Sequence, residues 1–368
     1  MKILFSAKGD PSAGSYRIPF IGMREVMSEM DDVEILDVGS QSVPDVVVCM
    51  AGQGEAIRLR NLYPQAYILL AKPHYEIAYS FFWKTNFIKS VKSLIRVVVG
   101  RAQNTNLKRI KEDIAVSDCV ISDSRRLHLS YRSEQKDSIF FRLLEKLPDI
   151  QYESVVPPAL GGVLNVCYHG HAELLNRAAE DFHFILKELS CNYKVNFFCM
   201  TSMKNKNKEI LFPGINTEFI DYDFSELIKL LPSMHIGLVP IRVRPSRIFS
   251  NKLLSVFLFG GFQDNLDICA EKASANAGRA YLFSHFGIPF IADPSSEILL
   301  DFGSIPELEF PVNRSEAGFF VNDILMAREK YLCISRKLIK TTYSKLNLNY
   351  ETHCLVTELK KRIKYSGN

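Results

Sequence analysis

The chain lacks most features that mark secreted, membrane-spanning or nucleic-acid-binding proteins. No apolar run approaches the roughly 18 residues of a spanning helix, and the opening MKILFSAKGD holds too short an apolar run for a signal peptide. None of the eight cysteines forms a CxxC pair, so buried reduced thiols are expected and a zinc site is not. A net charge of +4 is too mild for a dedicated nucleic-acid binder. We therefore expect a cytoplasmic protein with no nucleic acid among its partners.

The order of strands and helices predicts an α/β protein of two tandem Rossmann-like, doubly wound domains that face each other across a cleft. A length of 368 residues suits two domains, and apolar strands such as PDVVVCM and LNVCYHG alternate with helical segments in both halves. Prolines and glycines in VVPPALGGVL, near residues 155–164, indicate the boundary. We predict an N-terminal domain at 1–160, a C-terminal domain at 161–348 and a helical tail at 349–368 that can pack back across the boundary.

The stretch NAGRAYLFSHFGIPFIADPSSE, residues 276–297, predicts an anion site at a helix N-terminus. A helix that begins near Asn276 places Gly278 and Arg279 in its first turn. Free N–H groups favour an anion there, glycine lets a ligand approach the backbone, and arginine forms paired hydrogen bonds with phosphate. The alternative for Arg279 is a solvated surface position. Glu297 follows the next strand, where a carboxylate can accept ribose hydroxyls, and a surface loop or a helix N-terminus is its alternative.

Gly170 ends the first strand of the predicted second domain, in the sequence NVCYHGH. A glycine at a turn from strand to helix can cradle a diphosphate, and the neighbouring His169 can hydrogen-bond a ligand or the backbone. Metal ligation by His169 and His171 is not expected, because two histidines two positions apart lack a third ligand.

Four segments together resemble those of GT-B glycosyltransferases of the glycogen-synthase-like group. They are ILFSAKGDPSAGSYR, NVCYHGHAELLNR, YDFSELIKLLPSMHIGLVPI and NAGRAYLFSHFGIPFIADPSSE, and their order spans most of the chain. The resemblance implies that the second domain binds a nucleotide-sugar donor and that the first domain supplies the surface for a glycan or lipid-linked acceptor. It implies no cofactor, because the nucleotide sugar is a substrate, and no metal, because positive side chains and a helix dipole can stabilise the leaving diphosphate.

The resemblance also implies roles for individual residues. A basic residue of the donor site matches Arg177, whose alternative is an exposed helix face, and a catalytic or sugar-contacting group falls near His74, whose alternative is a turn beside Pro73. Two strand-end carboxylates are rival bases. The catalytic candidates are therefore His74, Asp10 and Asp123. Further candidates are a glycine in a loop that can approach the diphosphate and a group of basic residues that can cover the donor phosphates. The alternative for the basic residues is a plain solvated loop. These further candidates are Gly14, Arg242, Arg244 and Lys252.

One departure from the family leaves the reaction open. Many retaining members carry two glutamates near this helix, and this chain has Ser274 and Leu282 at those positions. We expect a metal-independent enzyme of the hexosyltransferase type in surface polysaccharide or glycoconjugate synthesis. The alternatives are a nucleotide-sugar 2-epimerase on the same scaffold and a catalytically degenerate module that binds a sugar or a partner.

Residues 77–111 combine aromatic and basic side chains without a single acid. The segment includes Trp83, the only tryptophan of the chain. This composition is typical of an interfacial helix on an anionic membrane and predicts peripheral attachment to the inner membrane face. The alternatives are a first-domain helix with a buried aromatic face and a lid over the acceptor site.

Overall fold

The computed structural model describes residues 1–9, 16–71, 105–133, 135–142, 144–147, 155–170, 172–201, 212–239, 278–292, 296–311 and 314–366. Contacts divide the chain into two compact units. The first unit holds the described residues of Met1–Lys146 and Asn347–Asn368, and the second holds those of Leu147–Val243 and Ala273–Leu346.

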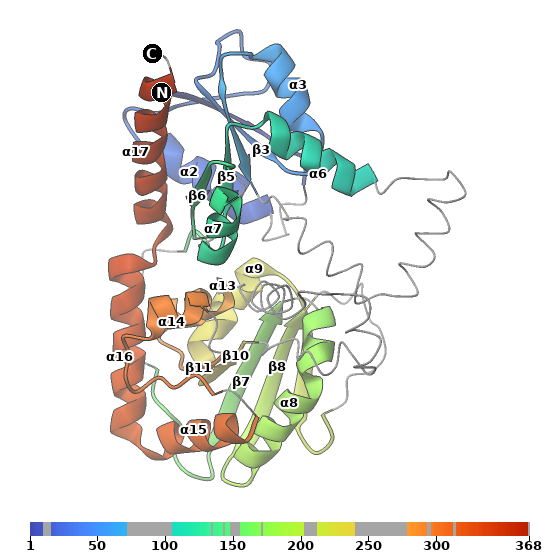
Figure 1. Ribbon diagram of the computed structural model, residues 1–368. Coiled ribbons are helices and arrows are strands. Elements are labelled where there is room, and N and C mark those ends of the chain that lie inside the picture. Colours follow the sequence, from blue (N-terminus) through green and yellow to red (C-terminus); the bar gives the residue numbers. More distant parts are fainter. Residues whose placement is uncertain are drawn as a thin grey trace, which may run out of the picture. The chain divides into compact units, whose positions relative to one another are not determined.

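The first unit is built on a parallel sheet of six strands (Figure 1). In spatial order the strands are β2 (Glu34–Leu36), β1 (Lys2–Ser6), β3 (Val46–Met50), β4 (Tyr67–Ala71), β5 (Cys119–Ser122) and β6 (Ser138–Phe140). The helical segments are η1 (Arg17–Gly22, a π-helical turn), α2 (Met23–Ser28), α3 (Glu55–Leu62), α6 (Thr105–Val116), α7 (Arg125–Ser133) and α17 (Leu348–Ser366). Strand and helix alternate along most of the unit, as in a doubly wound domain, and only β2 and β3 follow each other without a helix among the described residues.

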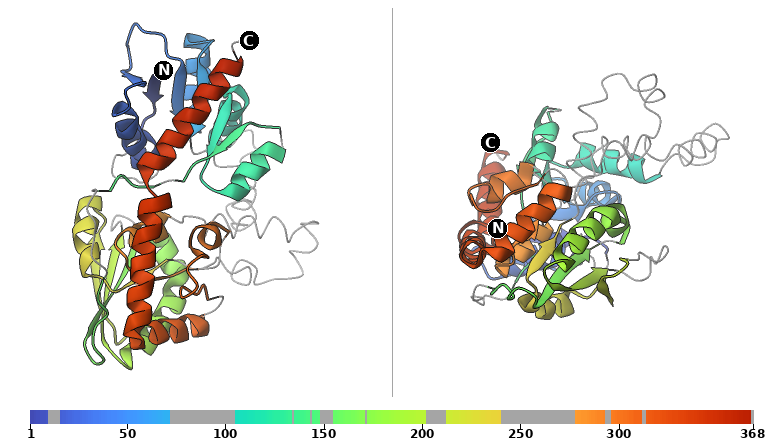
Figure 2. Two further views of the ribbon diagram at one scale, coloured as in Figure 1. Left: turned by 90° about the vertical axis from the view of Figure 1, so that its left-hand side faces the viewer. Right: turned by 90° about the horizontal axis from the view of Figure 1, so that it is seen from below.

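The central strand β3 shows why this sheet lies between two layers. Val47 packs in one cluster with Ala56 and Leu59 of α3, whereas the alternating Val46 and Val48 point to the other face and are equally buried. An unbroken β-branched run therefore suits a strand covered on both faces. Helix α3 packs beside α6, and α17 packs beside α2 (Figure 2, left).

The second unit repeats this plan with five parallel strands. In spatial order they are β11 (Phe290–Ile291), β10 (Ile236–Leu238), β7 (Val163–Gly170), β8 (Lys194–Thr201) and β9 (Asn216–Asp221). The helices are α8 (Ala172–Ser190), α9 (Phe224–Leu230), η3 (Leu231–Ser233), α13 (Gly278–His285), α14 (Ser296–Phe302), α15 (Arg314–Met326) and α16 (Arg328–Lys345). Two such units confirm the predicted pair of Rossmann-like domains.

Strand order fixes where each unit offers a ligand site. In the first sheet the chain moves outward from β1 to β2 on one side and from β3 to β6 on the other. In the second sheet it moves from β7 to β9 on one side and from β10 to β11 on the other. The connections diverge at such a switch point and leave a crevice at the carboxyl ends of the two strands, where open α/β sheets bind ligands. The switch points lie between β1 and β3 and between β7 and β10.

The unit bounds differ from the predicted domain bounds. The main segment of the first unit ends at Lys146, ahead of the predicted residue 160. The stretch 155–162 belongs to the second unit, because it leads directly into β7 and its Gly161 N–H donates to the carbonyl oxygen of Asn192 at 2.9 Å. The proline and glycine residues therefore mark the entry to a strand rather than the last residue of the first unit.

The C-terminal helix α17 belongs to the first unit although it follows α16 of the second. Among its contacts, Arg142 Nη1 donates to Glu351 Oε1, and the two side chains are only 16% and 8% exposed. Lys360 also pairs with Asp32 at the surface of the unit. Of these two ion pairs, the largely buried pair between Arg142 and Glu351 is expected to contribute more to holding α17 on the first unit, because water screens it less.

We expect Glu351→Ala to lower the free energy of unfolding by about 3 kcal/mol, because it leaves the largely buried Arg142 guanidinium without this carboxylate. Urea unfolding followed by circular dichroism measures the change. The matched control is Asp37→Ala, which removes a carboxylate from the exposed pair with Arg24 and should cost less than about 1 kcal/mol. Equal losses in the two variants would contradict this role of Glu351.

Candidate functional site

Arg279 lies at the end of β7, in the first turn of α13. Its Nε donates a hydrogen bond to the carbonyl oxygen of His169 at 2.7 Å, and its guanidinium carbon lies 5.8 Å from the centre of the Tyr168 ring. The side chain is buried, with 8% of the residue exposed. The alternative of a solvated surface arginine is therefore wrong, because strand order brings α13 against the carboxyl end of β7.

Gly170, the last residue of β7, lies directly beneath this guanidinium. Its φ of +133° is one that side-chain-bearing residues rarely adopt. A Cβ atom added at this position would lie 2.4 Å from both Nε and Nη2 of Arg279. Only glycine therefore lets the arginine rest on the strand end, a requirement that the sequence pattern alone does not show.

The terminal nitrogens of Arg279 make no hydrogen bond with any described residue. Within the part of the chain that the structure describes, Nε makes its one hydrogen bond and the guanidinium has no carboxylate partner. A buried guanidinium is costly to hold without hydrogen bonds or a counter-charge. The arrangement therefore favours an anion at the carboxyl end of β7, and both Nη groups can donate to it.

A hydroxyl that the sequence analysis missed lies beside this place. Thr201 ends β8 and pairs in register with Gly170 of β7. Its Oγ1 is buried and has no hydrogen-bond partner among the described residues. On the other side, the buried His169 ring contacts the Phe283 ring edge-on, with ring centres 5.2 Å apart. The available signal for Thr201 was its place at the end of a strand next to β7.

Glu297 lies in the first turn of α14 and is 1% exposed. That burial rules out the surface-loop interpretation and leaves the helix N-terminus and the ribose contact. A carboxylate in a first helical turn is stabilised by the helix dipole. In the same helix, Asp301 Oδ2 accepts a hydrogen bond of 2.7 Å from the hydroxyl of Tyr281, which ties α14 to α13.

The remaining sequence-predicted residues fall in two groups. Arg177 is part of α8, with its side chain outside the described residues, and Asp123 follows β5 of the first unit as a half-buried residue. The candidates wholly outside the described residues are Asp10, Gly14, His74, Arg242, Arg244 and Lys252. The structure therefore brings together His169, Gly170, Gly278 and Arg279 in the second unit.

The switch point of the first unit carries a polar cluster that the sequence analysis also missed. Glu55 Oε2 accepts hydrogen bonds from Ser6 Oγ at 3.1 Å and from Arg58 Nη2 at 2.6 Å. The hydrogen bond from Arg58 is the main cause that lowers the pKa of Glu55, so this carboxylate stays ionised at neutral pH. The available signal was the sequence GQGE, which begins two residues after the last residue of the buried strand β3.

Beneath this cluster, a buried carboxylate fixes the loop between β3 and α3. Asp113 Oδ2 accepts hydrogen bonds from the backbone N–H groups of Gly52 at 2.8 Å and Gly54 at 3.1 Å. Burial raises the pKa of Asp113. The first unit thus presents an ordered loop and an ionised carboxylate at its switch point.

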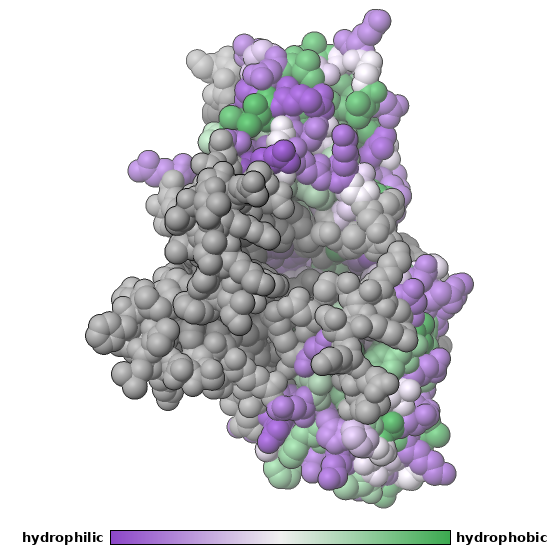
Figure 3. All heavy atoms as spheres, turned by 90° about the vertical axis from the view of Figure 1, so that its right-hand side faces the viewer, coloured by the Kyte–Doolittle hydropathy of each residue, from purple (hydrophilic) through white to green (hydrophobic). Residues whose placement is uncertain are grey.

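The described part of the chain contains neither a membrane-spanning helix nor a group of metal ligands. No helix there is long and apolar enough to cross a membrane, and no group of three or more potential metal ligands occurs there. On the face drawn in Figure 3, polar and apolar residues are interspersed among the described residues. Of the predicted membrane segment, residues 77–104 lie outside the described residues, and in α6 Ile110 is buried while Arg109 is exposed.

Comparisons with known proteins identify the fold. No protein-family model and no curated protein matches the chain. Among solved structures, sucrose-phosphate synthase from Thermosynechococcus elongatus has a TM-score of 0.61 at 12% identity and covers 100% of this chain and 99% of its own. WaaG, a glycosyltransferase involved in lipopolysaccharide biosynthesis, has 0.58 at 8%, covering 98% and 99%. HepE of Anabaena in complex with UDP-glucose has 0.55 at 10%, covering 98% and 100%. The chain has the two-domain GT-B fold.

Proposed function

We propose that the protein is a glycosyltransferase that moves a sugar from a nucleotide-sugar donor to a glycan or lipid-linked acceptor. The observation that carries the proposal is the buried Arg279 guanidinium, which rests on Gly170 at the switch point of the second sheet. Neither of its Nη groups pairs with a carboxylate among the described residues. A diphosphate suits that guanidinium, because phosphate oxygens are negatively charged and can accept two parallel N–H groups of an arginine. The likeness to HepE in complex with UDP-glucose makes a UDP-sugar the first donor to test.

The proposed chemistry uses Arg279 at the step where charge develops. The bond between the anomeric carbon and the diphosphate oxygen breaks, and the nucleoside diphosphate leaves with the bonding electrons. The acceptor hydroxyl oxygen bonds to that carbon, and its proton passes to a base, for which His74, Asp10 and Asp123 are the candidates, or to an oxygen of the leaving diphosphate. Donors fixed in place before the reaction stabilise such a leaving group most effectively. Arg279 and the free N–H groups at the start of α13 supply these donors, so a metal ion is not required.

The first unit is proposed to hold the acceptor. Its switch point presents the ionised Glu55, fixed by Ser6 and Arg58, and a carboxylate of this kind can accept hydrogen bonds from sugar hydroxyls. The likeness to WaaG supports a role in surface polysaccharide or glycoconjugate synthesis. Peripheral membrane attachment through 77–111 and transfer of a hexose belong to the same proposal.

The test is transfer of labelled sugar from a panel of nucleotide sugars to lipid and glycan extracts, with product analysis. We expect acceptor-dependent product, and we expect it to persist in EDTA because Arg279 and α13 act on the diphosphate. A complete loss in EDTA that added metal restores would overturn the metal-independent scheme.

The same assay separates the alternatives. A sugar isomer formed from the donor without any acceptor would replace the transferase with a 2-epimerase. Nucleotide-sugar binding with neither product would leave a catalytically degenerate binding module.

A further inference from the structure

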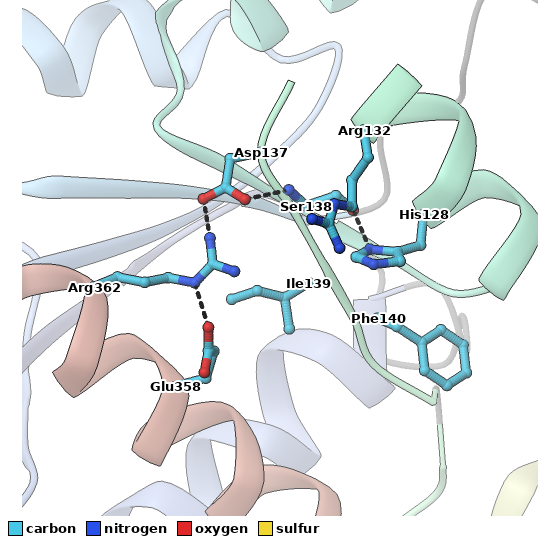
Figure 4. A pocket seen from close by; sticks show the side chains of 8 residues that line it. All are labelled: His128, Arg132, Asp137, Ser138, Ile139, Phe140, Glu358 and Arg362. Atoms are coloured by element: carbon cyan, nitrogen blue, oxygen red, sulfur yellow. Dashed lines mark hydrogen bonds and ion pairs between the residues drawn. The ribbon is translucent and has the colours of Figure 1, made fainter. Parts of the chain in front are cut away.

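A pocket of about 420 Å³ lies at β6, the edge strand of the first sheet (Figure 4). It is lined by His128 and Arg132 of α7, by residues 137–140 of and before β6, and by Glu358 and Arg362 of α17. This volume falls within the range of small-molecule sites, roughly 300–1,000 Å³. The strands β4 and β5 separate β6 from β3, so the pocket is distinct from the switch point of this sheet.

The charges of the pocket are separated in space. Arg362 Nε donates to Glu358 Oε1 at 2.9 Å, and its Nη1 pairs with Asp137, so one guanidinium holds both acids at the α17 side (Figure 4). At the α7 side Arg132 is exposed and makes no ion pair or hydrogen bond with a described residue. The two acids and two arginines cancel, so one proton on His128 would give the pocket a net positive charge.

His128 is placed to carry that proton when an anion is bound. Its Nδ1 lies 3.1 Å from Ser138 Oγ, which in turn lies 2.7 Å from the buried Ser122 Oγ. Its Nε2 makes no hydrogen bond with any described residue. Burial, and then the charges of Arg132 and Arg362, lower the pKa of His128. The charges of Arg132 and Arg362 disfavour a second positive charge on His128 while no ligand is present, and the same two charges favour a bound anion.

We propose that this pocket binds a small organic oxyanion, a carboxylate or a phosphate monoester, between His128 and Arg132. The oxyanion accepts hydrogen bonds from Arg132 and from His128 Nε2, and its organic part lies against Ile139 and Phe140. Because Glu358 and Arg362 of α17 line the pocket, an occupied pocket also stabilises α17 on the first unit.

Calorimetric titration of the full chain with phenyl phosphate, benzoate and the neutral benzyl alcohol tests the proposal. The first two probes share the ring and differ in the oxyanion, so they separate a phosphate site from a carboxylate site. We expect saturable binding of at least one anion, none of the alcohol, and slower hydrogen exchange in α17 when the anion is bound. Arg132→Gln should weaken the anion about tenfold or more, as loss of a charged hydrogen bond does.

The matched control is Arg328→Gln, which makes the same charge change at an exposed position of α16. Its affinity should equal that of the unchanged protein, and Arg132→Lys should retain part of the affinity. Arg279→Ala should bind the anion normally, which separates this pocket from the proposed donor site. Failure of both anions to bind, or equal affinity in Arg132→Gln and Arg328→Gln, would overturn the proposal.

The pH dependence gives a second readout. An anion raises the pKa of His128, so binding takes up a proton and affinity should rise as pH falls from about 8 to about 6. The charged groups that line the pocket with the imidazole are Arg132 of α7, Asp137 before β6, and Glu358 and Arg362 of α17, and of these Arg132 and Arg362 act on the pKa of His128. Ordinary carboxyl and guanidinium groups do not titrate in that range, whereas phenyl phosphate does, with a second pKa of about 6. The profile of His128→Gln is therefore compared with that of the unchanged protein for the same probe. The added rise in affinity toward low pH should be lost in His128→Gln, and identical profiles would contradict the role of His128.

Discussion

Arg279→Ala is expected to weaken binding of the nucleotide-sugar donor by tens-fold or more. The buried guanidinium would donate at least one charged hydrogen bond to the diphosphate, and such a bond contributes about 1.5–3 kcal/mol. The same contact should strengthen as the diphosphate leaves, so kcat should fall together with affinity. Calorimetry measures the dissociation constant, and initial rates of sugar transfer measure kcat.

Two variants control for charge and shape. Arg279→Lys keeps the positive charge but loses the planar fork, so its affinity should lie between those of the unchanged protein and the alanine variant. Arg328→Ala removes an exposed arginine elsewhere in the second unit and should leave donor affinity unchanged. If Arg279→Ala and Arg328→Ala bind donor equally well, Arg279 is not part of the site.

Gly170→Ala is expected to remove most of the donor affinity and also to destabilise the second unit. The new Cβ would lie 2.4 Å from Nε and Nη2 of Arg279, so the guanidinium must leave its position over the end of β7. A φ of +133° adds backbone strain of about 1–3 kcal/mol. Thermal unfolding measures the stability, and donor titration measures the affinity lost when the arginine is displaced.

Gly214→Ala separates these two causes. Gly214 also has a positive φ, +77°, but open space surrounds the position of its missing Cβ. This variant should lose some stability through backbone strain and keep full donor affinity. Normal donor binding in Gly170→Ala would show that the contact between Gly170 and Arg279 does not shape the site.

Local sequence patterns were sufficient to predict what short stretches of chain do. The apolar run PDVVVCM predicted the strand β3, and Asn276–Arg279 predicted a helix whose first turn holds Gly278 and Arg279. Alternation of strands and helices predicted the two Rossmann-like units, because that alternation forces parallel strands with helical connections.

Contacts between distant segments could not be predicted in the same way. Arg279 meets His169 and Gly170 only because β10 lies next to β7, and that neighbour relation is not encoded in any local motif. Thr201 and Glu55 were missed for the same reason. Thr201 lies at the site only because β8 pairs with β7, and Glu55 only because Ser6 of the neighbouring β1 contacts it. The pocket at β6 depends on α17, which joins the first unit from the far end of the chain.

The central claim is that the second unit binds a nucleotide sugar through Arg279 and Gly170. Calorimetric titration of the full chain with nucleoside diphosphates and their sugar conjugates, beginning with UDP and UDP-glucose, tests it most directly. We expect saturable, metal-independent binding of a nucleotide with one site per chain, weakened tens-fold or more in Arg279→Ala and unchanged in Arg328→Ala. Absence of binding for every nucleotide tried, or equal binding in both variants, would contradict it.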